Sequence, residues 1–169
     1  MNVYRNKEKC TVEIINISPE NRKRINDFIR SQWFSTDMVV RGEVIDMTIL
    51  DGFVAVESEK IIGLATYKIS GNECENMSLD SLKEEQGIGT ALVNRVIEVA
   101  TKEKCTKIKL ITTNDNINAI RFYQKRGFDM VHIYHNALGI ARKIKPSIPT
   151  IGEFNIPIKH EIEFEMNLL

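Results

Sequence analysis

Apolar and polar positions alternate near the start of the chain and then change to a helical period. Residues 11–17 alternate in the β-branched manner of a half-buried strand. Ser18 and Pro19 follow as an N-cap and a first-turn proline, and the apolar residues after them recur at helical spacing. This pattern predicts a helix to about Gln32. Residues 33–50 are irregular, and we expect a loop with room for one short helix.

The middle of the chain predicts three neighbouring strands and a long helix. Residues 53–56, 61–69 and 73–79 are β-rich runs separated by polar or glycine-containing turns, as in a meander. Residues 87–102 carry apolar side chains three and four positions apart, which places them on one face of a helix.

The C-terminal part repeats the alternation of strands and helices. Residues 108–112 form a short apolar strand, residues 116–126 an amphipathic helix ended by Gly127, and residues 128–134 another strand. Residues 161–166 alternate strictly, as in an antiparallel strand with one wet face. Prolines and glycines punctuate residues 139–157, to which we assign no element. The order predicts an α/β (α+β) fold in a single domain covering residues 1–169.

Composition narrows the class of protein. Lysine and arginine total 23, as do the acidic residues, so no net charge favours nucleic acid or an anionic membrane. No apolar run approaches the roughly 20 residues that span a bilayer, and the start of the chain does not resemble a signal peptide. Cys10, Cys74 and Cys105 are too few and too far apart for a disulfide framework or a metal motif. We expect a soluble cytoplasmic protein with a small-molecule partner.

A strand runs into a helix through paired glycines in residues 79–91. Free backbone N–H groups and the helix dipole make such a helix start an anion site, and glycine lets a phosphate approach closely. Gly89 is followed by Thr90 rather than the lysine of a Walker loop, and Leu92 stands where a Rossmann turn needs a small residue. By themselves, Gly87 and Gly89 are equally consistent with close packing of the helix on the sheet.

A second motif follows one strand later. Residues 116–128 read Asn-x-x-Ala-x-x-Phe-Tyr-x-x-x-Gly-Phe. In this order and separation, the two motifs resemble the acetyl-CoA motifs of the GNAT superfamily. The resemblance implies a mixed central sheet of about six to seven strands flanked by helices. It also implies transfer of an acetyl group from acetyl-CoA to a primary amine of a small molecule, by direct attack in a ternary complex.

The resemblance also implies roles for individual residues. The backbone of Leu79 pairs with pantetheine and polarises the thioester carbonyl, Asn116 hydrogen-bonds the cofactor, and Tyr123 protonates the departing thiolate. The pyrophosphate is held by consecutive residues at the helix start, namely Gln86, Gly87, Ile88, Gly89, Thr90 and Ala91. Structural alternatives remain open, since Leu79 fits the core, Asn116 fits an N-cap, and Tyr123 fits a packed aromatic residue.

One position departs from the family pattern. Glu84 stands where the family has glutamine or arginine, and its carboxylate beside Glu85 would repel a pyrophosphate. Lys83 or the backbone amides alone can offset this repulsion. On the following helix, Arg121, Lys125 and Arg126 are candidates for the 3′-phosphate of CoA or are simply solvated.

Amine acetylation requires a base, because an alkylammonium has a pKa of about 10. Glu73 and Glu75 share strand parity with Leu79, which predicts that all three project to one face. A solvent-facing role is equally open for each glutamate. His132 and His135 fall on opposite strand faces without a third ligand, so no metal is expected. Cys74 reads as a buried small hydrophobe, which favours direct transfer over an acyl-enzyme.

The acceptor is expected between the two unassigned stretches, residues 33–50 and 139–157. Trp33 and Tyr134 would line an apolar slot, and Arg41 would orient a carboxylate or phosphate, so a small amine bearing an anionic group is favoured. The structural alternative is that Trp33 packs the end of the first helix against the sheet and that the side chain of Arg41 is solvated. Competing functions are a non-catalytic acyl-CoA-binding module and an acetyltransferase of protein N-termini or lysines. The sequence is compatible with a monomer or a homodimer.

Overall fold

The computed structural model describes residues 11–83 and 85–168, which form a seven-stranded sheet, a separate two-stranded hairpin and several helices. The strands are β1 (Val12–Asn16), β2 (Asp37–Val40), β3 (Glu43–Asp46), β4 (Asp51–Glu57), β5 (Lys60–Ser70), β6 (Glu73–Ser81), β7 (Lys107–Thr113), β8 (Asp129–Tyr134) and β9 (Glu161–Asn167). The helices are α1 (Arg22–Trp33), α2 (Ile88–Lys102), α3 (Ile117–Gln124) and α4 (Ala137–Ile144), with 3-10 turns η1 (Met47–Ile49) and η2 (Glu153–Asn155).

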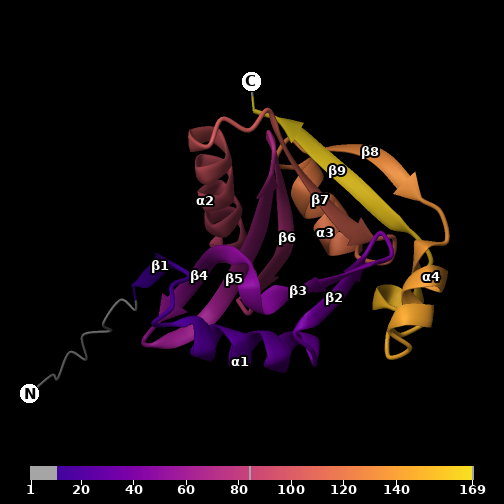
Figure 1. Cartoon of the computed structure of the whole chain (residues 1–169), viewed down its shortest axis with the longest axis horizontal. Coiled ribbons are helices and arrows are strands. Elements are labelled where there is room, and N and C mark those ends of the chain that lie inside the picture. Colours follow the sequence, from indigo (N-terminus) through magenta and orange to yellow (C-terminus); the bar gives the residue numbers. More distant parts are fainter. Residues whose placement is uncertain (1–10, 84, 169) are drawn as a thin grey trace, which may run out of the picture.

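The main sheet has the order β1-β4-β5-β6-β7-β9-β8 (Figure 1). Its pairs are antiparallel except β6 with β7, which run parallel because α2 crosses over between them. The sheet is mixed and flanked by helices, which confirms the predicted fold class.

Two apolar cores lie on opposite faces of the sheet. On one face, α2 packs through Leu92, Val93 and Val96 into a core that also holds Tyr123 and Phe164. On the other face, α1 contributes Ile25 and Ile29, four residues apart on one side of the helix, to a core with η1 and the sheet. The helical period of each sequence segment therefore translates into one buried stripe per helix.

The strand β6 contains an irregularity that decides which side chains face which core. Thr66 of β5 pairs with Ser78, whereas the next residue, Tyr67, pairs with Asn76, so Met77 is an extra residue in β6. A residue inserted in this way reverses the alternation of side chains beyond it. Met77 accordingly packs in the core under α1, whereas Leu79 packs against the core under α2.

The pairing of β6 with β7 is short. The register covers Glu73 to Asn76 against Lys107 to Leu110, whereas β6 continues to Ser81 and β7 to Thr113. Beyond Asn76 the two strands separate, and the interior of the sheet becomes accessible at this point.

The two stretches without an assigned element contain regular structure. Residues 33–50 form the β2–β3 hairpin and η1, and Arg41 and Gly42 at its turn have positive φ values of 49° and 75°. Positive φ at both turn residues matches the twist of a two-residue hairpin. Residues 137–144 form α4, which packs through Leu138 and Ala141 on Ile158 and contacts β2. No helix in the described part of the chain is long and apolar enough to span a bilayer.

Candidate active site

A cavity of about 820 Å³ lies where β6 and β7 separate, and residues from both faces of the sheet line it. Leu79, Asn116 and Tyr123 contribute from the side of α2 and α3. Residues 33–35, 37–40, 145 and 147–149, with Leu138 of α4, contribute from the side of the β2–β3 hairpin. The structure thus brings the expected thioester end of the cofactor site and both expected acceptor segments to one opening in the sheet.

Tyr123 and Asn76 form a hydrogen-bonded pair in this cavity. The amide Nδ2 of Asn76 donates to the Tyr123 hydroxyl oxygen at 3.3 Å, and both side chains are buried. Burial raises the pKa of the Tyr123 hydroxyl well above its usual value, so the hydroxyl keeps its proton at neutral pH. The oxygen Oδ1 of Asn76 is buried and finds no hydrogen-bond partner among the described residues. Since the Tyr123 oxygen accepts from Asn76, its own proton remains available to a ligand.

A cation lies next to the start of α2. Gly87 has a φ of 77°, and no side chain from the described residues caps the helix. Arg126 donates to the Thr90 hydroxyl through Nε at 3.1 Å, and its guanidinium lies 3.4 Å from the centre of the Phe122 ring. Burial lowers the pKa of Arg126, yet arginine remains charged in proteins. This helix start therefore offers free N–H groups and a positive charge, as an anion site requires.

The other residues expected at the phosphate site are not equivalent, because the backbone N–H of Ala91 already donates to the carbonyl of Gly87 at 2.9 Å. Ile88 is buried in the core, and the position of a Cβ atom on Gly89 would lie 3.3 Å from the Phe122 ring. Gln86 is exposed, whereas Thr90 and Ala91 are partly buried. Lys83 pairs with Glu57, and Glu84 lies outside the described residues. Asn116 does cap α3, accepting from the N–H of Ala119 at 3.0 Å, and it also lines the cavity.

The expectation that Glu73, Glu75 and Leu79 share a face is wrong. The extra residue Met77 lies between them, so the two glutamates and Leu79 project to opposite faces of the sheet. Neither glutamate lines the cavity. The parity argument assumed an uninterrupted strand, and nothing in the local sequence marks the bulge.

Both glutamates are engaged with cations instead. Glu73 binds Lys107 at 3.1 Å and Lys109 at 2.8 Å, and these hydrogen bonds lower the pKa of its carboxyl. Glu75 binds the Arg41 guanidinium in a bidentate pair at 2.7 and 2.9 Å. A carboxylate that is held in this way is poorly suited to take a proton from an attacking amine.

Of the three residues expected to bind the acceptor, one lines the cavity and two do not. Trp33 lines the cavity, and its indole N–H donates to Asp80 at 3.0 Å. Arg41 and Tyr134 are not lining residues. The guanidinium of Arg41 is committed to Glu75, and the Tyr134 hydroxyl donates to Glu163 at 2.5 Å. An anionic acceptor held by Arg41 is therefore not favoured by this arrangement.

Two polar residues that sequence reasoning missed are buried in the cavity wall. Asn76 lies directly before the bulge, and Glu161 is the first residue of β9 with an exposed fraction of 3%. The segment EIEFEM showed alternation, but alternation alone assigned its glutamates to the solvent. Only the packing of the β2–β3 hairpin over the start of β9 buries Glu161, through the backbone N–H of Arg41.

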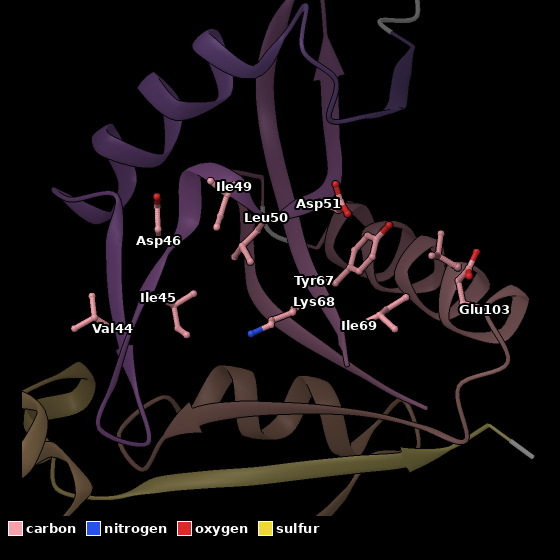
Figure 2. Close-up of a pocket in the computed structure, with 11 residues that line it drawn as sticks. Val44, Ile45, Asp46, Ile49, Leu50, Asp51, Tyr67, Lys68, Ile69 and Glu103 are labelled. Carbon is pink, nitrogen blue, oxygen red and sulfur yellow. The ribbon is translucent and has the colours of Figure 1, made fainter. Parts of the chain in front are cut away.

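A second cavity lies on the far side of the hairpin and lacks these features. Figure 2 shows this cavity, which has β3 and η1 on one side and β5 and the end of α2 on the other. Its volume is about 730 Å³. Its lining combines apolar residues with Asp46, Asp51, Tyr67, Lys68 and Glu103, and it includes no described residue of either sequence motif. Cys74 is buried, and burial raises its pKa to about 12, so it is not a reactive thiol.

Comparisons with known proteins agree with this geometry. A sequence model of the acetyltransferase (GNAT) family matches residues 20–128. The uncharacterized protein YdhI of Bacillus subtilis (strain 168) is 47% identical over 152 residues, which cover 88% of this chain and 95% of the relative. This identity and coverage extend the similarity well beyond the matched family segment.

Solved structures share the fold at lower identity. A GNAT family acetyltransferase from Elizabethkingia anophelis with acetyl-CoA bound matches with a TM-score of 0.65 at 20% identity, over 92% of this chain and 97% of that chain. An IAA acetyltransferase from Bacillus cereus ATCC 14579 matches with a TM-score of 0.67 at 20% identity, over 93% of this chain and 99% of that chain. On the family match over residues 20–128, together with this shared fold, the chain belongs to the acetyltransferase (GNAT) family and is an acyltransferase.

Proposed function

We propose that this protein transfers an acetyl group from acetyl-CoA to a primary amine of a small molecule by direct attack in a ternary complex. The observation that carries the proposal is the cavity between β6 and β7, which is lined from both faces of the sheet. A donor and an acceptor that enter from opposite faces would meet at this opening in an orientation suited to attack. The buried, unreactive Cys74 supports transfer without an acyl-enzyme.

The described residues fit a CoA thioester at both ends. The uncapped start of α2 and the adjacent Arg126 suit a pyrophosphate, and Leu79, Asn116 and Tyr123 lie where the thioester end would be held. The unpartnered Oδ1 of Asn76 supplies a buried acceptor that a ligand N–H can satisfy. The acetyl-CoA bound to the Elizabethkingia anophelis protein of the same fold supports this assignment. Bound acetyl-CoA supplies the acetyl group as a thioester.

Tyr123 acts in this scheme as the proton donor to the departing sulfur. Its raised pKa keeps the hydroxyl protonated, and the hydrogen bond from Asn76 leaves the hydroxyl proton free to point into the cavity. Because Glu73 and Glu75 are bound to cations elsewhere, the proton of the attacking ammonium leaves through a cavity-lining group or water.

The far side of the cavity favours a small acceptor. The Lys145 ammonium donates to the backbone carbonyl of Asp37 at 2.7 Å and so links α4 to the β2–β3 hairpin. This bridge connects the two segments that would receive the acceptor, and a site enclosed between connected segments suits a small molecule better than a folded protein surface.

The test is an acetylation screen of the purified protein with acetyl-CoA and panels of small amines and peptides. We expect N-acetylated small amines in mass spectra, and CoA release that depends on the amine. If only peptides were acetylated, the acceptor would be a peptide or protein amine and not a small molecule. Binding of acetyl-CoA without release of CoA from any acceptor would instead indicate a non-catalytic binding module.

A further inference from the structure

Glu161 is a buried carboxylate in the acceptor half of the cavity, outside both sequence motifs. Its two oxygens accept the same backbone N–H of Arg41, at 3.0 and 3.2 Å. A carboxylate has about four acceptor positions, so most of its hydrogen-bonding capacity remains after this contact. Its exposed fraction of 3% limits what water can supply.

The charged groups described around Glu161 do not neutralise its negative charge. The nearby cation, Arg41, is bound in a bidentate pair to Glu75, which is itself an anion that acts on Glu161. Tyr134 faces Glu161 from β8 and donates its hydroxyl to Glu163. Burial raises the pKa of the Glu161 carboxyl despite Arg41. A buried carboxylate without a full counterion costs free energy, which a cationic ligand would offset.

The remaining wall on this side is mostly apolar. Val39, Val40, Ile111, Leu138, Ile148 and Pro149 line it. Among the lining residues that the structure describes, the other charged side chains are Asp37 and Lys145. Lys145 is directed to the carbonyl of Asp37. The site therefore combines one buried negative charge with apolar walls.

We propose that Glu161 binds a cationic group of the acceptor and selects amines with an apolar body over amines that carry a carboxylate. This proposal rests on the proposed function and names its substrate class. An acceptor carboxylate would face Glu161 and Glu75 as like charges, and the guanidinium of Arg41 that could receive it is already occupied. The cationic acceptor thus supplies the counterion that Glu161 lacks among the described residues.

The test compares hexylamine, hexamethylenediamine and aminohexanoate as acceptors for the wild type and Glu161→Gln. The variant keeps an oxygen for the Arg41 N–H and loses the charge. We expect the wild type to prefer hexylamine and hexamethylenediamine. In the variant, kcat/KM for these two falls at least about tenfold, as for loss of a charge-assisted bond, while acetyl-CoA affinity is unchanged. Aminohexanoate loses less, because removal of the repulsion between its carboxylate and Glu161 offsets the lost contact to its ammonium. Glu161→Asp, which keeps the charge, is expected to restore part of the preference.

Glu165→Gln is the matched control, because Glu165 lies on the same strand face, binds Lys107 and does not line the cavity. Trp33, the single tryptophan, lines the cavity and reports amine binding by fluorescence without turnover. Equal binding and equal selectivity in wild type and Glu161→Gln would overturn the role of Glu161. Amine binding that depends on Glu161, without any acetylated product, would instead overturn the proposed function alone. No fluorescence response and no turnover of wild type with hexylamine would overturn both.

Discussion

Tyr123 packs in the core and also presents its hydroxyl to the cavity, where we propose that it acts as a proton donor. Its ring packs edge-on against Phe122 and Phe128, while its hydroxyl meets Asn76 in the cavity. The sequence motif located this tyrosine, and a packed core aromatic was the alternative to a catalytic role. In the structure the ring completes the core under α2, which fits that alternative, and the hydroxyl ends at the opening between β6 and β7, which is compatible with the proposed catalytic role.

Replacing Tyr123 by phenylalanine separates the two roles. We expect Tyr123→Phe to lower kcat about a hundredfold with little change in acetyl-CoA affinity, because the ring remains and the proton donor is lost. Steady-state kinetics under conditions where chemistry is rate-limiting measure the first quantity, and calorimetry measures the second. Tyr67→Phe is the control, since Tyr67 lies outside this cavity. A Tyr123→Phe enzyme as fast as the wild type would leave this residue a structural role only.

Among the predicted elements, β6 differs from its expectation in which side chains share a face. Its alternation was correct on each side of Met77, but the extra residue reversed the parity between the glutamates and Leu79. A bulge satisfies its backbone through pairing with neighbouring strands, which local residue types do not encode. Asn76, which donates to Tyr123, lies directly before this bulge and is the last residue of β6 that pairs with β7.

The start of α2 is the element that we expect to bind the pyrophosphate. Gly89→Glu places a negative charge beside the first turn and crowds Phe122, so we expect the dissociation constant of acetyl-CoA to rise at least about tenfold. Calorimetry at low and high salt measures this change, and salt should reduce it by screening.

Two variants separate charge from crowding in that experiment. Gly89→Gln introduces a side chain of similar size without charge, and Asn94→Glu adds the same charge at an exposed position farther along the helix. The anion site predicts that Gly89→Gln weakens binding less than Gly89→Glu and that Asn94→Glu has little effect. Acetyl-CoA affinity unchanged in Gly89→Glu would place the phosphates elsewhere.

For the molecule as a whole, the buried carboxylate of Glu161 opposes stability. Its pKa is raised above the ordinary value of 4.5 by burial, with Glu75 adding to and Arg41 opposing the shift. The folded state therefore binds a proton more tightly than the unfolded state. The destabilisation is present at pH values above the folded pKa and disappears as the pH falls toward the unfolded value.

We therefore expect Glu161→Gln to raise the melting temperature at neutral pH. A gain of 1 kcal/mol corresponds to about 2–4 °C for a chain of this size, and stabilisation at a functional site commonly accompanies loss of activity. The difference from wild type should shrink as the pH is lowered to about 4.5, which calorimetric melting at several pH values measures. Glu165→Gln should give no increase, because it removes a partner of Lys107. A lower melting temperature for Glu161→Gln at neutral pH would contradict the view that its charge is uncompensated.

Helices and strands that show a clear residue period along the chain could be predicted from the sequence. It also located the two motif segments, because helical spacing, paired glycines and the Asn-x-x-Ala-x-x-Phe-Tyr order are written in consecutive residues. It missed the β2–β3 hairpin, whose strands are short and whose Arg41-Gly42 turn is an unusual turn sequence, and it missed α4, which contains Gly139 and is stabilised by a small core with Ile158.

Which polar groups meet at the cavity depends on contacts between segments that are far apart in the sequence. Asn76 joins Tyr123 across 47 positions in sequence, and the Arg41 backbone buries Glu161 across 120. The two candidate bases form ion pairs with distant residues. Glu73 binds lysines of β7, and Glu75 binds Arg41 at the hairpin turn. Burial and charge pairing arise from contacts between distant segments, and residue spacing along one strand carries no information about them.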